Sequence, residues 1–160
     1  MPKVRLTLVA LSIASLLGAG LQAAVAGSTC TINGTAGNDT LNGTAGNDVI
    51  CGKGGHDRLN GRGGNDILRG GPGEDALSGK SGNDLLVGGI GRDHLYDHTG
   101  IDKLYGGDNS DKCIDAGDGA GGDVVSGGLG VDVYHADGGD SVSGVETSVM
   151  LCPPYFPPSG

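Results

Sequence analysis

The chain has 160 residues, of which 35 are glycine, one is phenylalanine and none is tryptophan. So few large apolar side chains cannot hold a domain together by burial alone. A formal net charge of −9 excludes nucleic acid as a partner, because phosphates require a basic surface, and it favours a small cation instead.

Residues 1–26 form a segment of their own. Lys3 and Arg5 precede an apolar stretch at 6–21, and Ala24-Val25-Ala26 then supplies the small residues that signal peptidase reads. The apolar stretch is short for a membrane span and is interrupted by glycines. We therefore expect a cleaved signal peptide, cleavage near Ala26, and a secreted, extracellular chain without a membrane span. Losing two cations leaves 8 Lys and Arg (10 − 2) against 19 Asp and Glu, a net charge of −11.

From Gly34 onward the sequence follows a nine-residue period. Position four is glycine in all units but one, and position eight is leucine or isoleucine through the first eight units. The units are GTAGNDTLN (34–42), GTAGNDVIC (43–51), GKGGHDRLN (52–60), GRGGNDILR (61–69), GGPGEDALS (70–78), GKSGNDLLV (79–87), GGIGRDHLY (88–96), DHTGIDKLY (97–105), GGDNSDKCI (106–114) and, after an insertion at 115–117, DGAGGDVVS (118–126) and GGLGVDVYH (127–135). Position six is always aspartate: Asp39, Asp48, Asp57, Asp66, Asp75, Asp84, Asp93, Asp102, Asp111, Asp123 and Asp132.

The repeated residues predict a turn that binds a hard cation. Glycine at positions one, two and four lets the backbone adopt positive φ and turn tightly. The aspartate at position six then places an anionic oxygen beside the carbonyl groups of the turn. Ca²⁺ accepts roughly six to eight such oxygens in irregular cages, whereas Mg²⁺ requires an octahedron and Zn²⁺ prefers histidine or thiolate. We therefore expect several bound Ca²⁺ ions.

Positions seven to nine predict a very short strand whose middle side chain points inward. Two units then form one coil of about 18 residues with a strand on each side, and successive coils stack about 4.8 Å apart. Each residue lies over the residue one coil away, so the aspartates fall into two rows, one along each edge of the coil.

These units resemble the GGxGxDxUx nonapeptide of the RTX family over about 34–135. The resemblance implies an all-β fold, a right-handed parallel β-solenoid or β-roll with two nonapeptides per coil and calcium ions between the turns. It also implies that the position-six aspartates and the turn carbonyls hold the ions. On this pattern Asp39 shares an ion with the turn at 52–57, and Asp48 shares one with the turn at 61–66.

The chain departs from many members of this family. A signal peptide is expected at its N-terminus and no large catalytic or toxic domain is expected before the repeats, so toxin and protease activities are not carried over. No HExxH or GxSxG motif is present, and the four histidines share no metal-ligand spacing. We therefore expect no enzyme, but a calcium-binding protein with a structural, sensing or surface-interaction role.

Two other functions stay open. A Ca²⁺-dependent adhesion module that binds ice or polysaccharide would present a regular row of threonines. Thr35 and Thr44 begin such a row at position two, but Lys53, Arg62 and Lys80 end it. An accessory module of a secreted enzyme is the other alternative, although a thin roll offers no pocket for converging polar groups.

Calcium is expected to decide whether the chain folds. Carboxylates stacked about 5 Å apart repel each other by about 3 kcal/mol at an effective dielectric constant of about 20. One inward side chain per unit cannot offset both this repulsion and the entropy lost by a glycine-rich chain. The metal-free chain is therefore expected to be largely unfolded and to gain β structure with Ca²⁺.

The quality of the sites is expected to follow the regularity of the repeat. Units over 34–96 are regular and should bind best. In the next two units Asp97 replaces the first glycine, Asn109 replaces the fourth, and Cys113 takes the inward position. The insertion at 115–117 should make one coil bulge, so weaker or missing ions are expected there.

The ends of the roll require caps, because an open roll exposes apolar ends and strand edges. We expect an N-terminal cap at 27–33, the roll at 34–135, C-terminal capping strands at 136–151 and a proline-rich extended tail at 152–160.

Four cysteines in an exported chain predict two disulfides with three possible pairings. Cys30 and Cys51 lie before and at the close of the first coil, where a bridge would staple the N-terminal cap. Cys113 would then pair with Cys152, but the repeat places these two residues two coils apart in one column. Their pairing therefore requires a break in register after residue 135.

Overall fold

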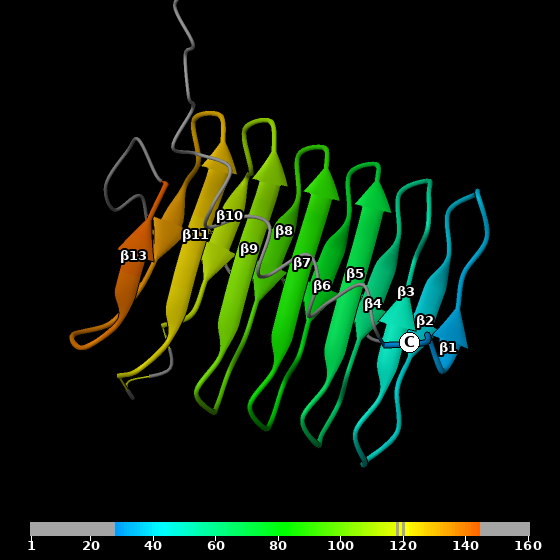
Figure 1. The fold of residues 1–160 in the computed structure, drawn as a ribbon, viewed down its shortest axis with the longest axis horizontal. Helices are drawn as coiled ribbons and strands as arrows, with labels where there is room; N and C mark the ends of the chain where they lie inside the picture. The colour runs from blue at the N-terminus through cyan, green and yellow to red at the C-terminus, as the bar shows by residue number, and fades with distance from the viewer. Residues whose placement is uncertain (1–27, 118, 120, 145–160) are drawn as a thin grey trace, which may run out of the picture.

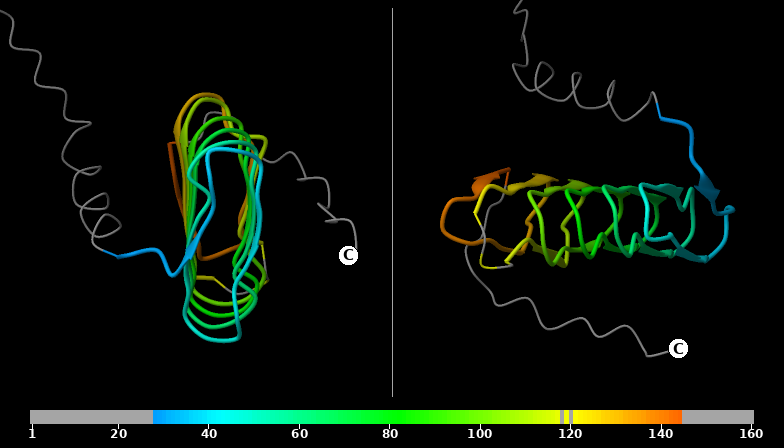
Figure 2. Two further views of the ribbon diagram at one scale, coloured as in Figure 1. Left: turned by 90° about the vertical axis from the view of Figure 1, so that its right-hand side faces the viewer. Right: turned by 90° about the horizontal axis from the view of Figure 1, so that it is seen from below.

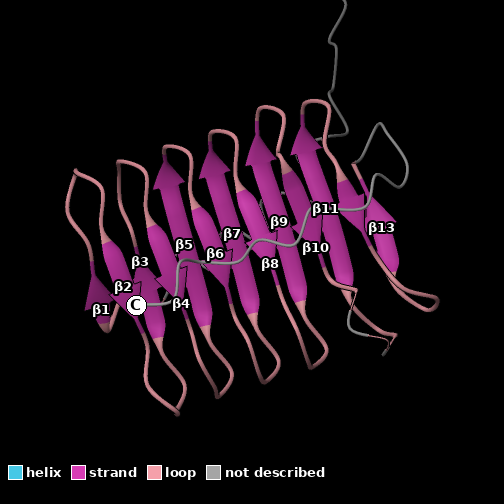
Figure 3. Ribbon diagram, turned by 180° about the vertical axis from the view of Figure 1, so that it is seen from behind, coloured by secondary structure: helices cyan, strands magenta, loops and turns pink. Residues whose placement is uncertain are grey.

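The computed structural model describes residues 28–117, 119 and 121–144, and every regular element within these ranges is a β-strand (Figure 1). The strands form two sheets, and all paired strands run parallel (Figure 3). The odd sheet contains β1 (Ile32–Asn33), β3 (Val49–Cys51), β5 (Ile67–Pro72), β7 (Leu85–Ile90), β9 (Lys103–Asp108), β11 (Val124–Leu129) and β13 (Ser141–Ser143). The even sheet contains β2 (Thr40–Asn42), β4 (Arg58–Asn60), β6 (Ala76–Ser78), β8 (His94–Tyr96), β10 (Cys113–Asp115) and β12 (Tyr134–His135).

The chain alternates between the two sheets, so two consecutive strands and their turns make one coil. Seen along the stack, the coils superimpose as a flattened loop with one sheet on each long side (Figure 2). Leu68 pairs with Leu86 and Leu86 with Leu104, so equal repeat positions of successive coils lie over one another. The predicted all-β parallel roll with two nonapeptides per coil is confirmed.

The core is a double column of position-eight side chains between the two sheets. Each strand from β1 to β12 contributes one large apolar side chain, and the strand neighbours on either side of it point away from the interior. The fully buried members are Ile50, Leu59, Leu68, Leu77, Leu86, Leu95, Leu104, Ile114 and Val125. Ile32, Leu41 and Tyr134 close the two ends and are only partly buried.

The inward position of β10 differs from the prediction for Cys113. Ile114 pairs with Leu95 and is fully buried, whereas Cys113 pairs with His94. The regular two-unit spacing still holds between Asp93 and Asp111, so one extra residue enters the coil just before β10. The slip places the larger isoleucine in the core, where it buries more apolar area than a cysteine. At β11 the spacing between coils is longer again, since Val124 pairs with Lys103, so the inserted residues are shared between two places.

The structure describes part of the cap that was predicted at each end of the roll. A disulfide joins Cys30 to Cys51 across 21 residues of sequence, as predicted. At the other end β13 pairs with β11, with Ser141 beside Val124, and it is exposed throughout. The segment at 1–26, the tail at 152–160 and Cys152 lie outside the described residues, so the signal peptide and the Cys113–Cys152 bridge stay predictions. Within the described part of the chain, no helix has the length and apolar character needed to span a membrane.

Candidate metal centres

The turns between strands depend on backbone conformations that glycine adopts easily. Position four carries positive φ in most units after the first coil, with values of 104° at Gly55 and 99° at Gly64. Position two does so as well, even where it is not glycine: φ is 82° at Lys53, 78° at Arg62 and 84° at Lys80. Side chains at these places are strained, since L-residues rarely adopt such values. These conformations allow the chain to turn tightly between the two sheets.

Position one requires glycine for a different reason from the one predicted. None of these glycines has positive φ among the described residues. A Cβ at Gly52 would instead lie within 3 Å of two oxygen atoms, Oδ2 of Asp57 and the carbonyl oxygen of Gly70. The same crowding by an aspartate oxygen and a carbonyl oxygen of the next coil recurs at Gly70, Gly88, Gly106 and Gly127. Glycine is needed there because oxygen atoms fill the space of a side chain.

The position-six aspartates lie in two rows along the two turn edges of the roll. After the first member of each row, every one of them accepts a hydrogen bond through Oδ1 from the backbone N–H of the aspartate one coil earlier. The distance is 2.8 Å from Asp57 N to Asp75 Oδ1 and 2.7 Å from Asp66 N to Asp84 Oδ1. The first row is Asp39, Asp57, Asp75, Asp93, Asp111 and Asp132, and the second row is Asp48, Asp66, Asp84, Asp102 and Asp123. The sequence-predicted residues are therefore brought together as two continuous ladders.

The second carboxylate oxygen, Oδ2, is buried without a hydrogen-bond donor through the middle of both rows. A buried anionic oxygen without a partner is costly and indicates a missing cation or donor. Among the described residues this holds for at least six position-six aspartates, each no more than 2 % exposed: Asp57, Asp66, Asp75, Asp84, Asp93 and Asp111.

These oxygens fit a calcium ion. Beside five position-one glycines, an unpartnered carboxylate oxygen and the backbone carbonyl of the next coil approach the same small region: Gly52, Gly61, Gly70, Gly88 and Gly106. The donors are hard oxygens from two adjacent coils, of the kind that Ca²⁺ accepts at irregular positions. Among the described residues, one cluster of three or more metal-ligating side chains is found, and it consists of aspartates alone. It contains no cysteine thiolate and no histidine nitrogen. The donor set therefore fits Ca²⁺ and does not fit Zn²⁺.

Burial changes the acidity of these carboxyls in the metal-free chain. Desolvation raises the pKa of Asp75 and Asp84 to about 6, and that of Asp93 and Asp111 to about 7. The hydrogen bond from the neighbouring backbone amide opposes the shift, and the charge of the neighbouring aspartate adds to it. A bound divalent cation would reverse this penalty, because it favours the ionised form.

In the first coil, the Oδ2 atoms of the position-six aspartates have hydrogen-bond donors. Oδ2 of Asp39 accepts hydrogen bonds from the backbone N–H of Thr35 at 2.6 Å and from its hydroxyl at 2.9 Å. Oδ2 of Asp48 accepts the same pair from Thr44, at 2.7 and 2.9 Å. These two carboxylates therefore have internal donors where the later ones have none.

Two further aspartates belong to the rows, and the repeat analysis did not assign them. Oδ1 of Asp140 accepts hydrogen bonds from the N–H groups of Gly122 at 3.0 Å and Asp123 at 3.1 Å, so it extends the second row. The signal was present in Gly138-Gly139-Asp140, a shortened copy of the repeat. The other is Asp97, which stands at position one of its unit.

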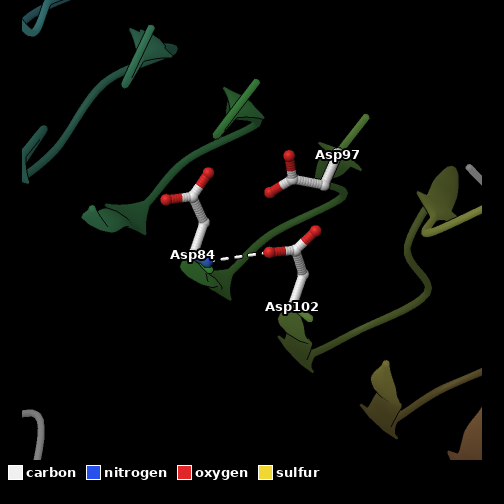
Figure 4. Close-up of side chains that lie close together, drawn as sticks. All are labelled: Asp84, Asp97 and Asp102. Carbon is white, nitrogen blue, oxygen red and sulfur yellow. Dashed lines mark hydrogen bonds between the residues drawn. The ribbon is translucent and has the colours of Figure 1, made fainter. Parts of the chain in front are cut away.

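Asp97 joins the second row from the side. One oxygen each of Asp84, Asp97 and Asp102 lies within 4.8 Å of the other two, and all three residues are buried (Figure 4). The carboxylate of Asp97 replaces the carbonyl oxygen that other coils place beside the position-one glycine, here Gly79. Desolvation, followed by the charges of Asp102 and Asp84, raises the pKa of Asp97 to about 8.

Comparison with known proteins identifies a repeat family and a similar solved structure. The family profile of the RTX calcium-binding nonapeptide repeat matches in four copies, at 31–59, 52–86, 87–114 and 118–142. The chain is also similar to the solution structure of the AlgE6R3 subunit from the Azotobacter vinelandii mannuronan C5-epimerase. The two are 30% identical over 56% of this chain and 52% of that chain, with a TM-score of 0.34. This chain thus matches about half the length of that solved structure, and no curated protein matches it.

Proposed function

Because the chain belongs to the RTX calcium-binding repeat family, we propose that it is an exported protein whose folding depends on Ca²⁺ ions held between successive coils. The ligands are the position-six aspartates together with turn carbonyls of the adjacent coil. The leader at 1–26 supports export, and the role outside the cell is structural or a surface interaction rather than catalysis.

The observation that carries this proposal is the run of buried Oδ2 atoms without donors, each beside an oxygen atom of the next coil or, at Asp84, of Asp97. Two rows of such oxygens repel along their whole length, by about 3 kcal/mol per neighbouring pair at an effective dielectric constant near 20. The core opposes this with a single side chain per strand. A divalent ion between coils turns the repulsion into attraction, and its binding energy becomes folding energy.

Circular dichroism of the purified protein tests the proposal. After removal of metal with EDTA the spectrum should be that of a largely unfolded chain, and excess Ca²⁺ should restore the β signal. Mg²⁺ at the same concentration serves as the control, since the irregular oxygen cage does not suit an octahedral ion. A β spectrum that is the same with chelator and with Ca²⁺ would refute calcium-dependent folding.

The alternative of a threonine-based surface for ice or polysaccharide has less support. The hydroxyls of Thr35 and Thr44 both donate to their own aspartates, so they are not directed to an external ligand. The next residue at this position in each row carries a cation, Lys53 or Arg62.

A further inference from the structure

The two coils that carry Asp84 and Asp102 differ from the other neighbouring coils of the described residues. Between these two position-six aspartates lies a third carboxylate, that of Asp97. Asp97 begins the unit at 97–105, where the repeat has glycine, and it lies directly after β8. In Figure 4 its carboxylate points toward that of Asp84, while Asp102 approaches from the next coil.

The buried oxygens of this cluster are directed into a shared space. Asp84 and Asp97 are each 2 % exposed, and Oδ2 of each has no hydrogen-bond partner. Both atoms lie within 3 Å of the point where a side chain of Gly79 would begin. The ammonium of Lys80, the residue after Gly79, contacts His98 at 3.2 Å and lies 5.9 Å from the centre of the Tyr96 ring.

The other oxygen of Asp97 is already engaged. Its Oδ1 accepts a hydrogen bond from the backbone N–H of His98 at 2.8 Å, which fixes the side chain in the orientation that directs Oδ2 to Asp84. Oδ1 of Asp102 likewise accepts from the backbone N–H of Asp84 at 2.8 Å. Wherever these coils are folded, the backbone therefore holds the cluster in place, so the side chains need little further ordering when an ion binds.

We propose that Asp84, Asp97 and Asp102 form a distinct cation site that binds Ca²⁺ before the other sites of the roll, and that it takes trivalent lanthanides more tightly still. This inference rests on the proposed function. An ordinary site contributes a carbonyl dipole where this one contributes a full negative charge, and affinity in oxygen sites rises with ligand charge. The sequence alone predicted the opposite, a weaker ion at Asp97, because the loss of glycine there suggested a damaged turn.

The test is calorimetric titration of the metal-free protein with Ca²⁺. The wild-type protein should show one site filled first, with a dissociation constant at least tenfold below that of the remaining sites. Asp97→Asn and Asp97→Gly should both abolish this first phase and leave the later ones. The glycine variant restores the residue that the repeat places at position one, so it retains the fold if the asparagine variant does not. Asp108→Asn removes an equal charge from an exposed residue and should leave the first phase unchanged.

Terbium luminescence gives an independent readout. Tyr96 is covalently adjacent to Asp97, so the first equivalent of Tb³⁺ should show tyrosine-sensitised emission, and Tyr96→Phe should remove most of it. Asp97→Asn should abolish the emission at one equivalent, while Asp108→Asn should preserve it. If the wild-type protein binds Ca²⁺ and Asp97→Asn keeps the first phase, the inference is overturned and the proposed function stands. If no Ca²⁺ binds to the wild-type protein, both are overturned.

Discussion

After the first coil, the position-six aspartates use their two carboxylate oxygens differently. Oδ1 accepts the backbone N–H of the preceding coil and fixes the side chain, whereas Oδ2 faces the carbonyl oxygen of the next coil. The hydrogen bond to Oδ1 is thus supplied by the backbone of the protein itself. The position of Oδ2 leaves a buried negative charge that only a proton or a cation can satisfy in the middle of the rows.

Protons should therefore stabilise the metal-free fold. Burial raises the pKa of Asp75 to about 6, of Asp93 to about 7 and of Asp97 to about 8, whereas these carboxyls titrate near 4 in the unfolded chain. Between these values the folded state binds protons that the unfolded state has released. The contribution of these carboxyls to stability is thus fully present below about pH 4 and is lost as the pH rises through 6 to 8.

Urea unfolding of metal-stripped protein at pH 5 and pH 8 checks this dependence. The midpoint should be higher at pH 5, and the β signal in the absence of urea should be larger there. The reverse order, or identical midpoints, would show that the buried carboxyls do not control the metal-free state. With saturating Ca²⁺ the order should invert, because protons compete with the ion for the same oxygens.

The glycines at positions one and three provide a matched pair of substitutions. In Gly61→Ala the new methyl group would meet Oδ2 of Asp66 and the carbonyl oxygen of Gly79, both within 3 Å. In Gly63→Ala the nearest atom is the Ser81 carbonyl oxygen at 4.0 Å, and the backbone does not have positive φ. We expect Gly61→Ala to destabilise the calcium-bound protein by about 1–3 kcal/mol and Gly63→Ala to change it by less than about 0.5 kcal/mol.

Thermal and urea unfolding with saturating Ca²⁺ would measure both variants. Equal effects of the two substitutions would contradict the crowding explanation and would favour a general preference for glycine in the turns.

Some site residues could be read from the sequence and others could not, for physical reasons. The aspartate column was visible because one residue type recurs at a fixed interval. Asp97 was interpreted as a departure from the repeat that weakens ion binding, because a one-dimensional pattern does not show that its carboxylate takes the place of a carbonyl oxygen. The donors from Thr35 and Thr44 were missed because their hydroxyls act within their own turn, which the period does not reveal.

At the scale of the strands, the nonapeptide phase predicts which residue of each strand is buried. The phase is correct wherever two complete units separate paired strands. It is wrong at β10, where Ile114 and not Cys113 pairs with the core residue Leu95. A column of similar residues cannot locate a one-residue slip, because the cost of the bulge and the gain from burying isoleucine are both tertiary effects. The unequal lengths of β7 and β8 are equally invisible in units of identical length.

Strand β7 tests how much the thin core contributes. Leu86 is fully buried, whereas Ile90 in the same strand is 55% exposed. Leu86→Ala should therefore destabilise the calcium-bound protein by about 2–5 kcal/mol, because it removes one complete rung of the core and leaves a cavity. Ile90→Ala should cost less than about 1 kcal/mol, since most of its side chain already contacts solvent.

Urea unfolding in saturating Ca²⁺ compares the two variants under identical metal occupancy. A loss for Leu86→Ala no larger than that for Ile90→Ala would mean that the ions and the backbone ladder alone determine the stability of the coil.

For the whole molecule, the roll is a chain of coils in which each coil contacts only its neighbours, so ions between coils link the entire stack. Neighbouring carboxylates in a row lie closer than the Debye length, which is about 8 Å at physiological ionic strength. Monovalent salt can therefore weaken their repulsion only in part, and it cannot join an oxygen of one coil to a carbonyl of the next.

Small-angle scattering should separate screening from bridging. An unfolded chain of this length has a radius of gyration on the order of 40 Å, and a compact fold has one of about 15 Å. We expect the metal-free protein at pH 8 to remain near the larger value in about 0.5 M NaCl and to contract to below about 20 Å with millimolar Ca²⁺. The extra carboxylate at Asp97 adds a second expectation, that contraction begins with the first ion bound. Contraction in NaCl alone would mean that charge screening is sufficient, and the oxygens between the coils would then need no ion to hold the stack together.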